Sequence, residues 1–482
     1  MKINTISQAC EADNVCTRAV AMDLCVGCGV CAGVCPAATL QMSWDARGLL
    51  RPTDAGNCSY KCGRCLDVCP FLDRPENEDT LAGALFNPRL GRSDNVGYYS
   101  DCYVGHAGGG FRERGTSGGM TGWFLSVLLE KRLVEHVICV RPKADSECLF
   151  EYAVMATSEE IRDASKSAYY PVHLSSVIRH VLGTRGRYAV VGLPCFIKAL
   201  RLASTRMPAL KERIVVAVGL VCGQTKSDGF AKYLLRQLGF APEDVRSVDF
   251  RGKRVGHPAN VFELRAADKH GNSKALPWSG TYAQAWTSGM FSPRACSFCD
   301  DTFAELADVS FMDAWLPEFA AESGGTNLVV CRSDLAAGLV REGIREGSVF
   351  LASIPVERVE ESQSAVSEWK RRDLSWRLWL AKRRAEPIPA KRVPPRRPPV
   401  WHAGRLRLRE SLRQLSLAEP CGGSCDEGAS RSAITRAVER KLYIYLRYLS
   451  LPLWAYRAKR LPIWLVGKVT SIGKRQACAR KG

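Results

Sequence analysis

Two blocks of closely spaced cysteines near the start of the chain have the residue types and the spacing to bind iron. They read Cys25-x2-Cys28-x2-Cys31-x3-Cys35-Pro36 and Cys58-x3-Cys62-x2-Cys65-x3-Cys69-Pro70. Iron prefers soft anionic ligands, and a thiolate provides both the charge and the softness. In such blocks three close thiolates bind one cubane, and the fourth, which precedes a proline, binds the cubane of the other block. We therefore expect two [4Fe–4S] clusters.

The two clusters are expected to share their ligands crosswise. One would be bound by Cys25, Cys28, Cys31 and Cys69, and the other by Cys58, Cys62, Cys65 and Cys35. The spacing resembles that of bacterial two-cluster ferredoxins, so residues 1–76 are predicted to form a ferredoxin-like domain, followed by a linker over residues 77–96. A pair of structural zinc sites is the alternative interpretation, although zinc usually binds two separated C-x2-C pairs.

Residues 97–365 must supply the scaffold for any further chemistry. They alternate β-branched runs with helical periods, which predicts an α/β body with a mixed sheet. The expected strands are Val134–Val140, Tyr188–Gly192, Ile214–Val221, Val245–Phe250, Val261–Arg265, Asp308–Met312 and Thr326–Cys331. The expected helices are Gly119–Arg132, Val172–Leu182, Phe196–Ala203, Asp228–Leu238 and Leu335–Glu346.

Four more cysteines and a glycine-rich segment lie where such a sheet places its sites. Cys195 and Cys222 each follow an expected strand, and a C-x2-C pair ends at Cys299. Cofactor sites gather at the carboxyl ends of parallel strands, so a third cluster and buried structural cysteines are both open interpretations. The segment 115–119, Gly-Thr-Ser-Gly-Gly, precedes an apolar helix and is either a phosphate-binding loop or an ordinary helix start.

These residues together resemble the family of coenzyme F420 hydrogenase/dehydrogenase beta subunits over roughly residues 20–360. The resemblance depends on an ordered set of short motifs rather than on any one of them. The set is Thr116-Ser117-Gly118-Gly119, Ser165-Lys166-Ser167-Ala168-Tyr169, Gly192-Leu193-Pro194-Cys195, Gly219-Leu220-Val221-Cys222-Gly223, Cys296-Ser297-Phe298-Cys299-Asp300, Ala307-Asp308-Val309-Ser310 and Gly325-Thr326-Asn327. The Arg251-Gly252-Lys253 segment is more similar to the bacterial branch, whose members often accompany exopolysaccharide genes.

The resemblance implies an iron–sulfur flavoprotein. Family members bind FAD and a further [4Fe–4S] cluster in the body, and the cluster ligands map onto Cys195, Cys222, Cys296 and Cys299. By the same resemblance, FAD would be held by Ser117, Gly118, Gly119, Ser165, Lys166 and Ser167. No catalytic acid or base can be assigned from the sequence.

The charge of the chain is concentrated near its C-terminal end. Residues 370–482 contain 28 of the 68 Lys and Arg and 7 of the 49 Asp and Glu, so their net charge is +21 and that of residues 1–369 is −2. A nearly neutral body disfavours a nucleic-acid partner. We expect a Pro/Arg-rich linker over 366–430 and a basic amphipathic helical tail with aromatic residues over 431–482. An anionic membrane surface suits such a tail, and a protein partner or a solvated tail are the alternatives.

Clustered cysteines without a recognisable signal peptide favour a cytoplasmic protein, peripheral to the inner face of the membrane if the tail binds there.

The first hypothesis for the function is an oxidoreductase that exchanges electrons between the clusters and FAD and transfers hydride to or from an organic substrate or a deazaflavin-like coenzyme. The second is an electron-transfer subunit that serves a ferredoxin or a partner enzyme and binds no substrate of its own. The third is a zinc scaffold.

Overall fold

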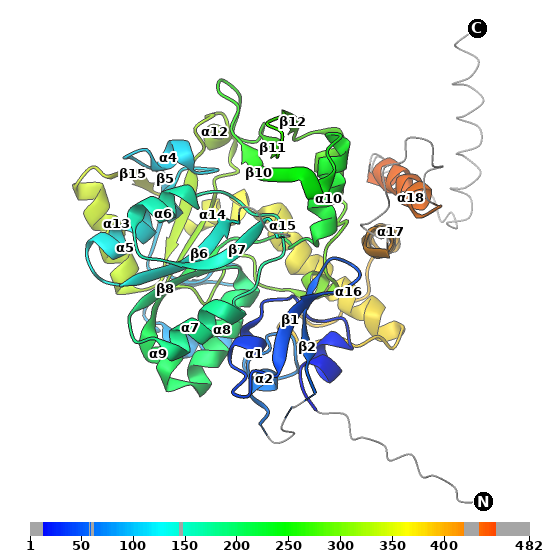
Figure 1. Cartoon of the computed structure of the whole chain (residues 1–482), viewed down its shortest axis with the longest axis horizontal. Coiled ribbons are helices and arrows are strands. Elements are labelled where there is room, and N and C mark those ends of the chain that lie inside the picture. The colour runs from blue at the N-terminus through cyan, green and yellow to red at the C-terminus, as the bar shows by residue number, and fades with distance from the viewer. Residues whose placement is uncertain (1–12, 57, 59–61, 144–147, 419–432, 450–482) are drawn as a thin grey trace, which may run out of the picture.

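The computed structural model describes residues 13–56, 58, 62–143, 148–418 and 433–449. Its N-terminal part, which we call the head, covers residues 13–72 and lies at the lower edge of the body (Figure 1). The head consists of η1 (Cys16–Val20), α1 (Val30–Gly33), β1 (Leu40–Trp44), β2 (Leu50–Asp54) and α2 (Arg64–Asp67). The strands β1 and β2 pair antiparallel. Gly29 and Gly63 adopt left-handed backbone conformations (φ of 75° and 63°) at the start of α1 and α2, which glycine does without strain.

The body is built around an eight-stranded mixed sheet, which confirms the predicted α/β class. The strand order is β15-β5-β14-β13-β9-β8-β6-β7. These strands are β5 (Asp101–Ala107), β6 (His136–Pro142), β7 (Phe150–Met155), β8 (Tyr188–Gly192), β9 (Ile214–Leu220), β13 (Val309–Asp313), β14 (Asn327–Cys331) and β15 (Val349–Ser353). The four central strands β6, β8, β9 and β13 run parallel, and the outer strands are antiparallel to their neighbours.

Helices cover both faces of this sheet, because neighbouring side chains on a strand point to opposite faces. Val190 faces the core that holds α7, α8 and the head, whereas Ala189 and Val191 face the core that holds α5 and α13. The covering helices are α4 (Phe111–Arg114), α5 (Met120–Glu130), α6 (Ser158–Asp163), α7 (Ser175–Gly183), α8 (Pro194–Arg206), α9 (Pro208–Arg213) and α13 (Asp334–Arg345). The head therefore shares one hydrophobic core with the body.

A smaller antiparallel sheet packs beside the main one with its own aromatic core. It has the order β10-β11-β12. Its elements and their neighbours are α10 (Asp228–Gln237), η2 (Pro242–Asp244), β10 (Val245–Gly252), β11 (Glu263–Asp268), β12 (Ser273–Pro277), α11 (Gly280–Thr287), η3 (Arg294–Phe298) and α12 (Pro317–Ala320).

Both segments expected to be linkers contain regular structure. Residues 77–96 contain α3 (Glu78–Leu85) and β3 (Gly91–Ser93), which pairs with β4 (Gly97–Tyr99), and Leu81 is buried in the same core as the head. After α14 (Val356–Ser362), residues 364–418 form α15 (Ser364–Lys370), α16 (Arg372–Arg383) and α17 (Val400–Ala418). Apolar residues at helical spacing, such as Leu374 and Leu378, explain the difference, because they are buried and give the helices an apolar face although basic residues dominate the composition.

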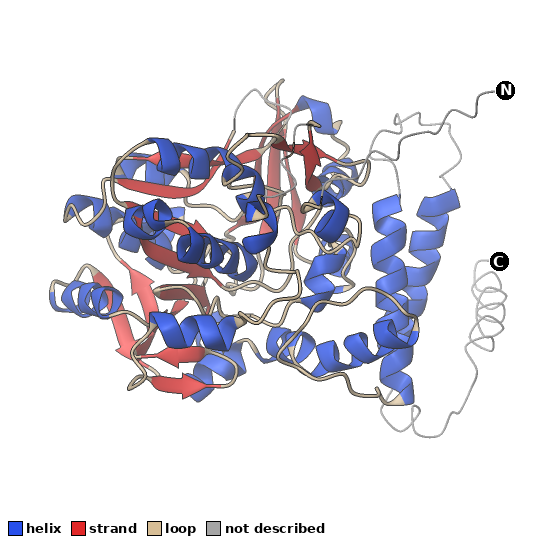
Figure 2. Cartoon of the chain, turned by 90° about the horizontal axis from the view of Figure 1, so that it is seen from below, coloured by secondary structure: helices blue, strands red, loops and turns tan. Residues whose placement is uncertain are grey.

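Only part of the expected tail lies within the described residues. Here α18 (Ala433–Leu449) packs beside α17 (Figure 2). Tyr445 of α18 is buried against the body, whereas Tyr443 is half exposed. Trp454, Tyr456 and Trp464 lie outside the described residues. Among the described residues, no helix is both long enough and apolar enough to cross a membrane.

Candidate functional site

The head cysteines fall into two groups. Burial raises the pKa of the Cys28 and Cys31 thiols, and the neighbouring thiolates raise it further; those of Cys25 and Cys69 act on both. Burial likewise raises the pKa of Cys65, and there the neighbouring thiolates include Cys58 and Cys35. These interactions relate Cys25, Cys28, Cys31 and Cys69 to one another, and Cys35 and Cys58 to Cys65. The two groups are adjacent, because the charge of Cys65 also acts on Cys31. Cys62 is exposed and stands next to residues that the structure does not describe.

Backbone N–H groups around the first group suit a cluster. The Gly27 N–H donates to the Cys25 Sγ at 3.3 Å. The Val30 N–H acts to lower the pKa of Cys28, and the Phe71 N–H acts to lower that of Cys69, although burial outweighs both and the pKa values are raised. N–H groups directed at sulfur stabilise its negative charge, in a free thiolate as in a cluster ligand.

Cys195, Cys222, Cys296 and Cys299 form a third group at the carboxyl ends of the central strands. Cys195 lies in the first turn of α8, directly after β8, and Cys222 follows β9. Cys296 lies on η3 and Cys299 follows it. Burial raises the pKa of the Cys195 thiol well above its usual value, and the thiolates of the other three cysteines raise it further.

Polar contacts to this third group come from both neighbouring segments. The Thr225 N–H and hydroxyl lie 3.3 and 3.4 Å from the Cys296 Sγ. The buried ammonium of Lys370 donates to the Cys299 Sγ at 3.2 Å and to the Asp301 carbonyl at 2.6 Å. Burial alone would lower the pKa of Lys370, but the thiolates around it outweigh burial and raise it. The sequence did not point to Lys370, which lies within the segment expected to be a linker.

The third group is close to the head. The charge of Cys28 contributes to the raised pKa of Cys195. The two segments are also joined directly, because the Leu174 N–H donates to the Cys28 carbonyl at 2.8 Å. A larger residue at position 29 would collide with His173 beside this contact, because its Cβ would lie only 2.9 Å from the His173 Cβ. The head is thus held against the body at the point where two cysteine groups approach each other.

No three His, Cys, Asp or Glu side chains within the described ranges converge closely enough to hold a single metal ion.

A cavity of about 570 Å³ opens beside the third group, and Cys222 lines it. This volume falls within the range of about 300–1,000 Å³ that is usual for cofactor and ligand sites. Five of the six residues predicted to hold FAD also line it, namely Ser117, Gly119, Ser165, Lys166 and Ser167. Gly118 packs instead against Gly105 and Asn327.

The loop of residues 115–119 is held tightly from behind. Ser117 does not cap α5; its hydroxyl donates to the Thr326 carbonyl at 3.0 Å. The Lys253 ammonium donates to the carbonyls of Ser117 (2.8 Å) and Gly324 (2.6 Å), and also to that of Arg112. Burial lowers the pKa of Lys253 to about 8. Lys253 therefore positions the loop rather than facing a ligand directly.

The segment of residues 165–167, the second one predicted to hold FAD, contacts the loop of residues 115–119 at the wall of the cavity. The hydroxyls of Ser167 and Thr116 are 3.1 Å apart, and the Ser165 hydroxyl donates to the Ile161 carbonyl at 2.8 Å. Lys166 forms an ion pair with Asp249 at 2.9 Å. Its charge is therefore partly compensated where it lines the cavity.

Two cavity residues were not identified as site residues from the sequence. Arg251 and Asp313 form a two-fold hydrogen-bonded ion pair, at 2.7 and 3.1 Å. The Arg251 guanidinium also lies over the rings of Phe262 (4.8 Å) and Trp315 (5.4 Å). Burial alone would lower the pKa of Arg251, but Asp313 outweighs it and raises it. Asp313 ends β13, so its place at the carboxyl end of a parallel strand was the available signal.

Comparisons with protein families cover both parts of this arrangement. Residues 102–179 and 185–356 match the two models for the N-terminal and C-terminal parts of the coenzyme F420 hydrogenase/dehydrogenase beta subunit. Residues 24–72 match the model of a 4Fe-4S dicluster domain.

Several curated proteins are similar to the chain. A subunit of the F(420)H(2) dehydrogenase of Methanosarcina mazei is 25% identical over 324 residues, which are 65% of this chain and 80% of that protein. The beta subunit of the coenzyme F420 hydrogenase of Methanothermobacter thermautotrophicus is 23% identical over 251 residues, which are 50% of this chain and 79% of that protein. Coenzyme F420-dependent sulfite reductase of Methanocaldococcus jannaschii is 25% identical over 309 residues, which are 60% of this chain but only 42% of that protein.

Among solved structures, a chain of the F420-reducing [NiFe] hydrogenase complex from Methanosarcina barkeri matches with a TM-score of 0.45 and 17% identity. The match covers 61% of this chain and 95% of that one.

Proposed function

The chain belongs to the family of coenzyme F420 hydrogenase/dehydrogenase beta subunits and contains a 4Fe-4S dicluster domain, and on that basis we propose that it is an iron–sulfur flavoprotein oxidoreductase. The proposal includes two [4Fe–4S] clusters in the head, a third on Cys195, Cys222, Cys296 and Cys299, and FAD in the large cavity. When bound, the clusters would carry single electrons, and FAD would convert between single electrons and the electron pair of a hydride.

The position of the third cysteine group is the observation that carries the proposal. Cys195 lies close enough to Cys28 of the head for their charges to interact, and Cys222 lines the large cavity. The group thus stands between the head and the cavity, where a one-electron carrier is needed if the two are to exchange electrons.

The residues of the cavity fit a flavin in chemistry as well as in size. Residues 115–117 and 165–167 line one part of it. Lys166 and Arg251 line it too, but Asp249 and Asp313 compensate their charges, so they would contribute N–H donors rather than net positive charge to a diphosphate or a reduced ring. Trp278 and Trp286 line it as well and exclude water from their side. Lys253 holds the loop of residue 117 in place, so that the backbone near a ligand does not need to reorganise.

The substrate is proposed to be an organic molecule or a deazaflavin-like coenzyme, because the similar proteins are named for coenzyme F420. The electron donor or acceptor on the other side is proposed to be a ferredoxin or a partner enzyme. A second candidate function is favoured by the same names, since two of these proteins are named as subunits. In that case the chain would pass electrons to a partner and bind no substrate of its own.

Anaerobic isolation of the full chain, followed by iron counting and cofactor extraction, tests the proposal. Three clusters of four predict about 12 irons per chain, with bound FAD. Cys222→Ser should lower the count by about four irons and leave the head clusters in place. Cys102→Ser is the matched control, because Cys102 is buried in β5 away from all three groups and should keep the full count.

The possible outcomes separate the hypotheses. Protein without acid-labile sulfide and without flavin contradicts the proposal, and colourless protein with bound zinc supports a scaffold. Bound FAD that a ferredoxin-like donor reduces, but that does not react with small acceptors, supports the electron-transfer role.

A further inference from the structure

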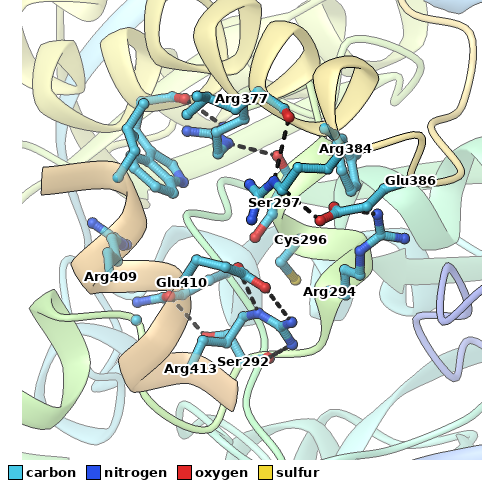
Figure 3. Close-up of a pocket in the computed structure, with 17 residues that line it drawn as sticks. Ser292, Arg294, Cys296, Ser297, Arg377, Arg384, Glu386, Arg409, Glu410 and Arg413 are labelled. Carbon is cyan, nitrogen blue, oxygen red and sulfur yellow. Dashed lines mark hydrogen bonds and ion pairs between the residues drawn. The ribbon is translucent and has the colours of Figure 1, made fainter. Parts of the chain in front are cut away.

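A second cavity, of about 50 Å³, lies where α16 and α17 meet η3, and Cys296 lines it (Figure 3). Gln224 lines both this cavity and the large one. The third cysteine group therefore has a cavity on either side, with Cys222 facing one and Cys296 facing the other. The volume is several times what a buried water requires, which is about 10–15 Å³.

The lining of this cavity is strongly basic. It contains five arginines and two glutamates: Arg294, Arg377, Arg384, Arg409, Arg413, Glu386 and Glu410. Both carboxylates are already paired. Glu410 binds Arg413 at 2.6 Å, and Glu386 binds Arg294 and Arg384, each at 3.2 Å.

Arg377 and Arg409 are left without a carboxylate. Within the described part of the chain, neither forms an ion pair, and both guanidiniums lie over the ring of Trp369, at 3.7 and 3.8 Å from its centroid. Arg377 donates to the carbonyls of Ser297 (2.7 Å) and Trp369 (2.8 Å), but its Nη1 is buried without a partner. Burial lowers the pKa of Arg377 to about 9 and also lowers that of Arg409.

The nearest carboxylates, Asp373 and Glu410, raise the pKa of Arg377 in part, but they are bound to Arg405 and Arg413. Two neighbouring cations that share no carboxylate of their own are unfavourable where burial removes them from water. The contact to the cysteine group comes from Lys370, which binds the Cys299 Sγ, and not from these two arginines. Guanidinium groups present forked donors that match a carboxylate, phosphate or sulfate.

We propose that this cavity binds one small oxyanion, held by Arg377 and Arg409. Arg384, whose side chain is 48% exposed, lies on the solvent side of the lining and provides a basic approach. Because Cys296 lines the same cavity, the bound negative charge should lower the reduction potential of a cluster on the third cysteine group. The effect on the potential depends on the proposed function, whereas the binding does not.

Isothermal titration calorimetry on the anaerobically purified full chain tests the binding. Inorganic phosphate, sulfate and acetate are titrated separately at constant ionic strength. We expect saturable binding of about one anion per chain by at least one of them, and Arg409→Gln should weaken it about tenfold or more, because a charge-assisted hydrogen bond is lost. Arg407→Gln removes the same charge from an exposed position of the same helix and should leave the binding unchanged.

The proposal is wrong if the unaltered chain shows no saturable binding of any of the three anions, or if Arg409→Gln binds as tightly as the control. If Arg409→Gln does not fold, Arg409→Lys keeps the charge but loses the fork, and it should also bind more weakly. A redox titration with and without the bound anion tests the second part. Binding without a shift of the potential overturns the link to the cluster, and iron-free protein that still binds the anion contradicts the proposed function alone.

Discussion

The buried ammonium of Lys370 should raise the reduction potential of a cluster on the third cysteine group, and Lys370→Met tests this. Lys370 is almost fully buried, and its Nζ lies 3.2 Å from the Cys299 Sγ. Methionine has a similar length and no charge, so the substitution removes the electrostatic contribution with little change in volume. Removing a positive charge makes the addition of an electron less favourable, so the potential should fall.

The size of the effect follows from the contact distance. Two unit charges 3.2 Å apart interact by about 5 kcal/mol at an effective dielectric constant of about 20. An added electron is spread over the whole cluster, so less than half of this, about 2 kcal/mol, should act on the couple. For a one-electron step this corresponds to a fall of about 90 mV.

The measurement is a redox titration of the full-length holoprotein followed by electron paramagnetic resonance. Lys382→Met is the control, because Lys382 is exposed on α16 and should leave the potential unchanged. Lys370→Arg keeps the charge and should stay near the value of the unaltered protein. A Lys370→Met variant that keeps its iron and also its potential would refute the electrostatic argument.

Two further predictions concern stability. Gly119→Ala should destabilise the protein by about 2–4 kcal/mol in denaturant unfolding, because Gly119 has a φ of 78° and a Cβ there would lie 2.4 Å from the Phe111 carbonyl. Gly338→Ala is the control, because Gly338 lies on the open side of α13 and its substitution should not destabilise the protein. Equal losses of stability in the two variants would contradict the steric reason. Burial lowers the pKa of His173 below 6.5, so the unfolded chain binds a proton first and stability should fall as the pH drops below about 6.5. His173→Gln should make that fall smaller, which unfolding curves at pH 7.5 and at pH 5.5 would show, and an identical fall would contradict it.

The local spacing of the sequence was enough to predict several features. The head cysteines that we expect to bind the clusters lie within a few residues of each other, so backbone geometry alone brings Cys25, Cys28 and Cys31 together. Burial of whole strands such as Tyr188–Gly192 follows from their apolar composition. The predicted bounds of this strand are those of β8 in the structure. The α/β class was likewise predicted from the sequence alone, and so was the family, from the order of its motifs.

Tertiary packing decided what joins these parts. Lys370 and Cys299 are 71 residues apart, and Arg251 and Asp313 are 62 residues apart. An apolar helix face shows that a segment will be buried, but it does not identify the surface that buries it, because many surfaces would satisfy the same hydrophobic pattern. The segment after residue 366 was therefore predicted from its Pro and Arg content to be a linker. Only the folded chain shows that it places Lys370 on a cysteine and Arg377 and Arg409 at a cavity.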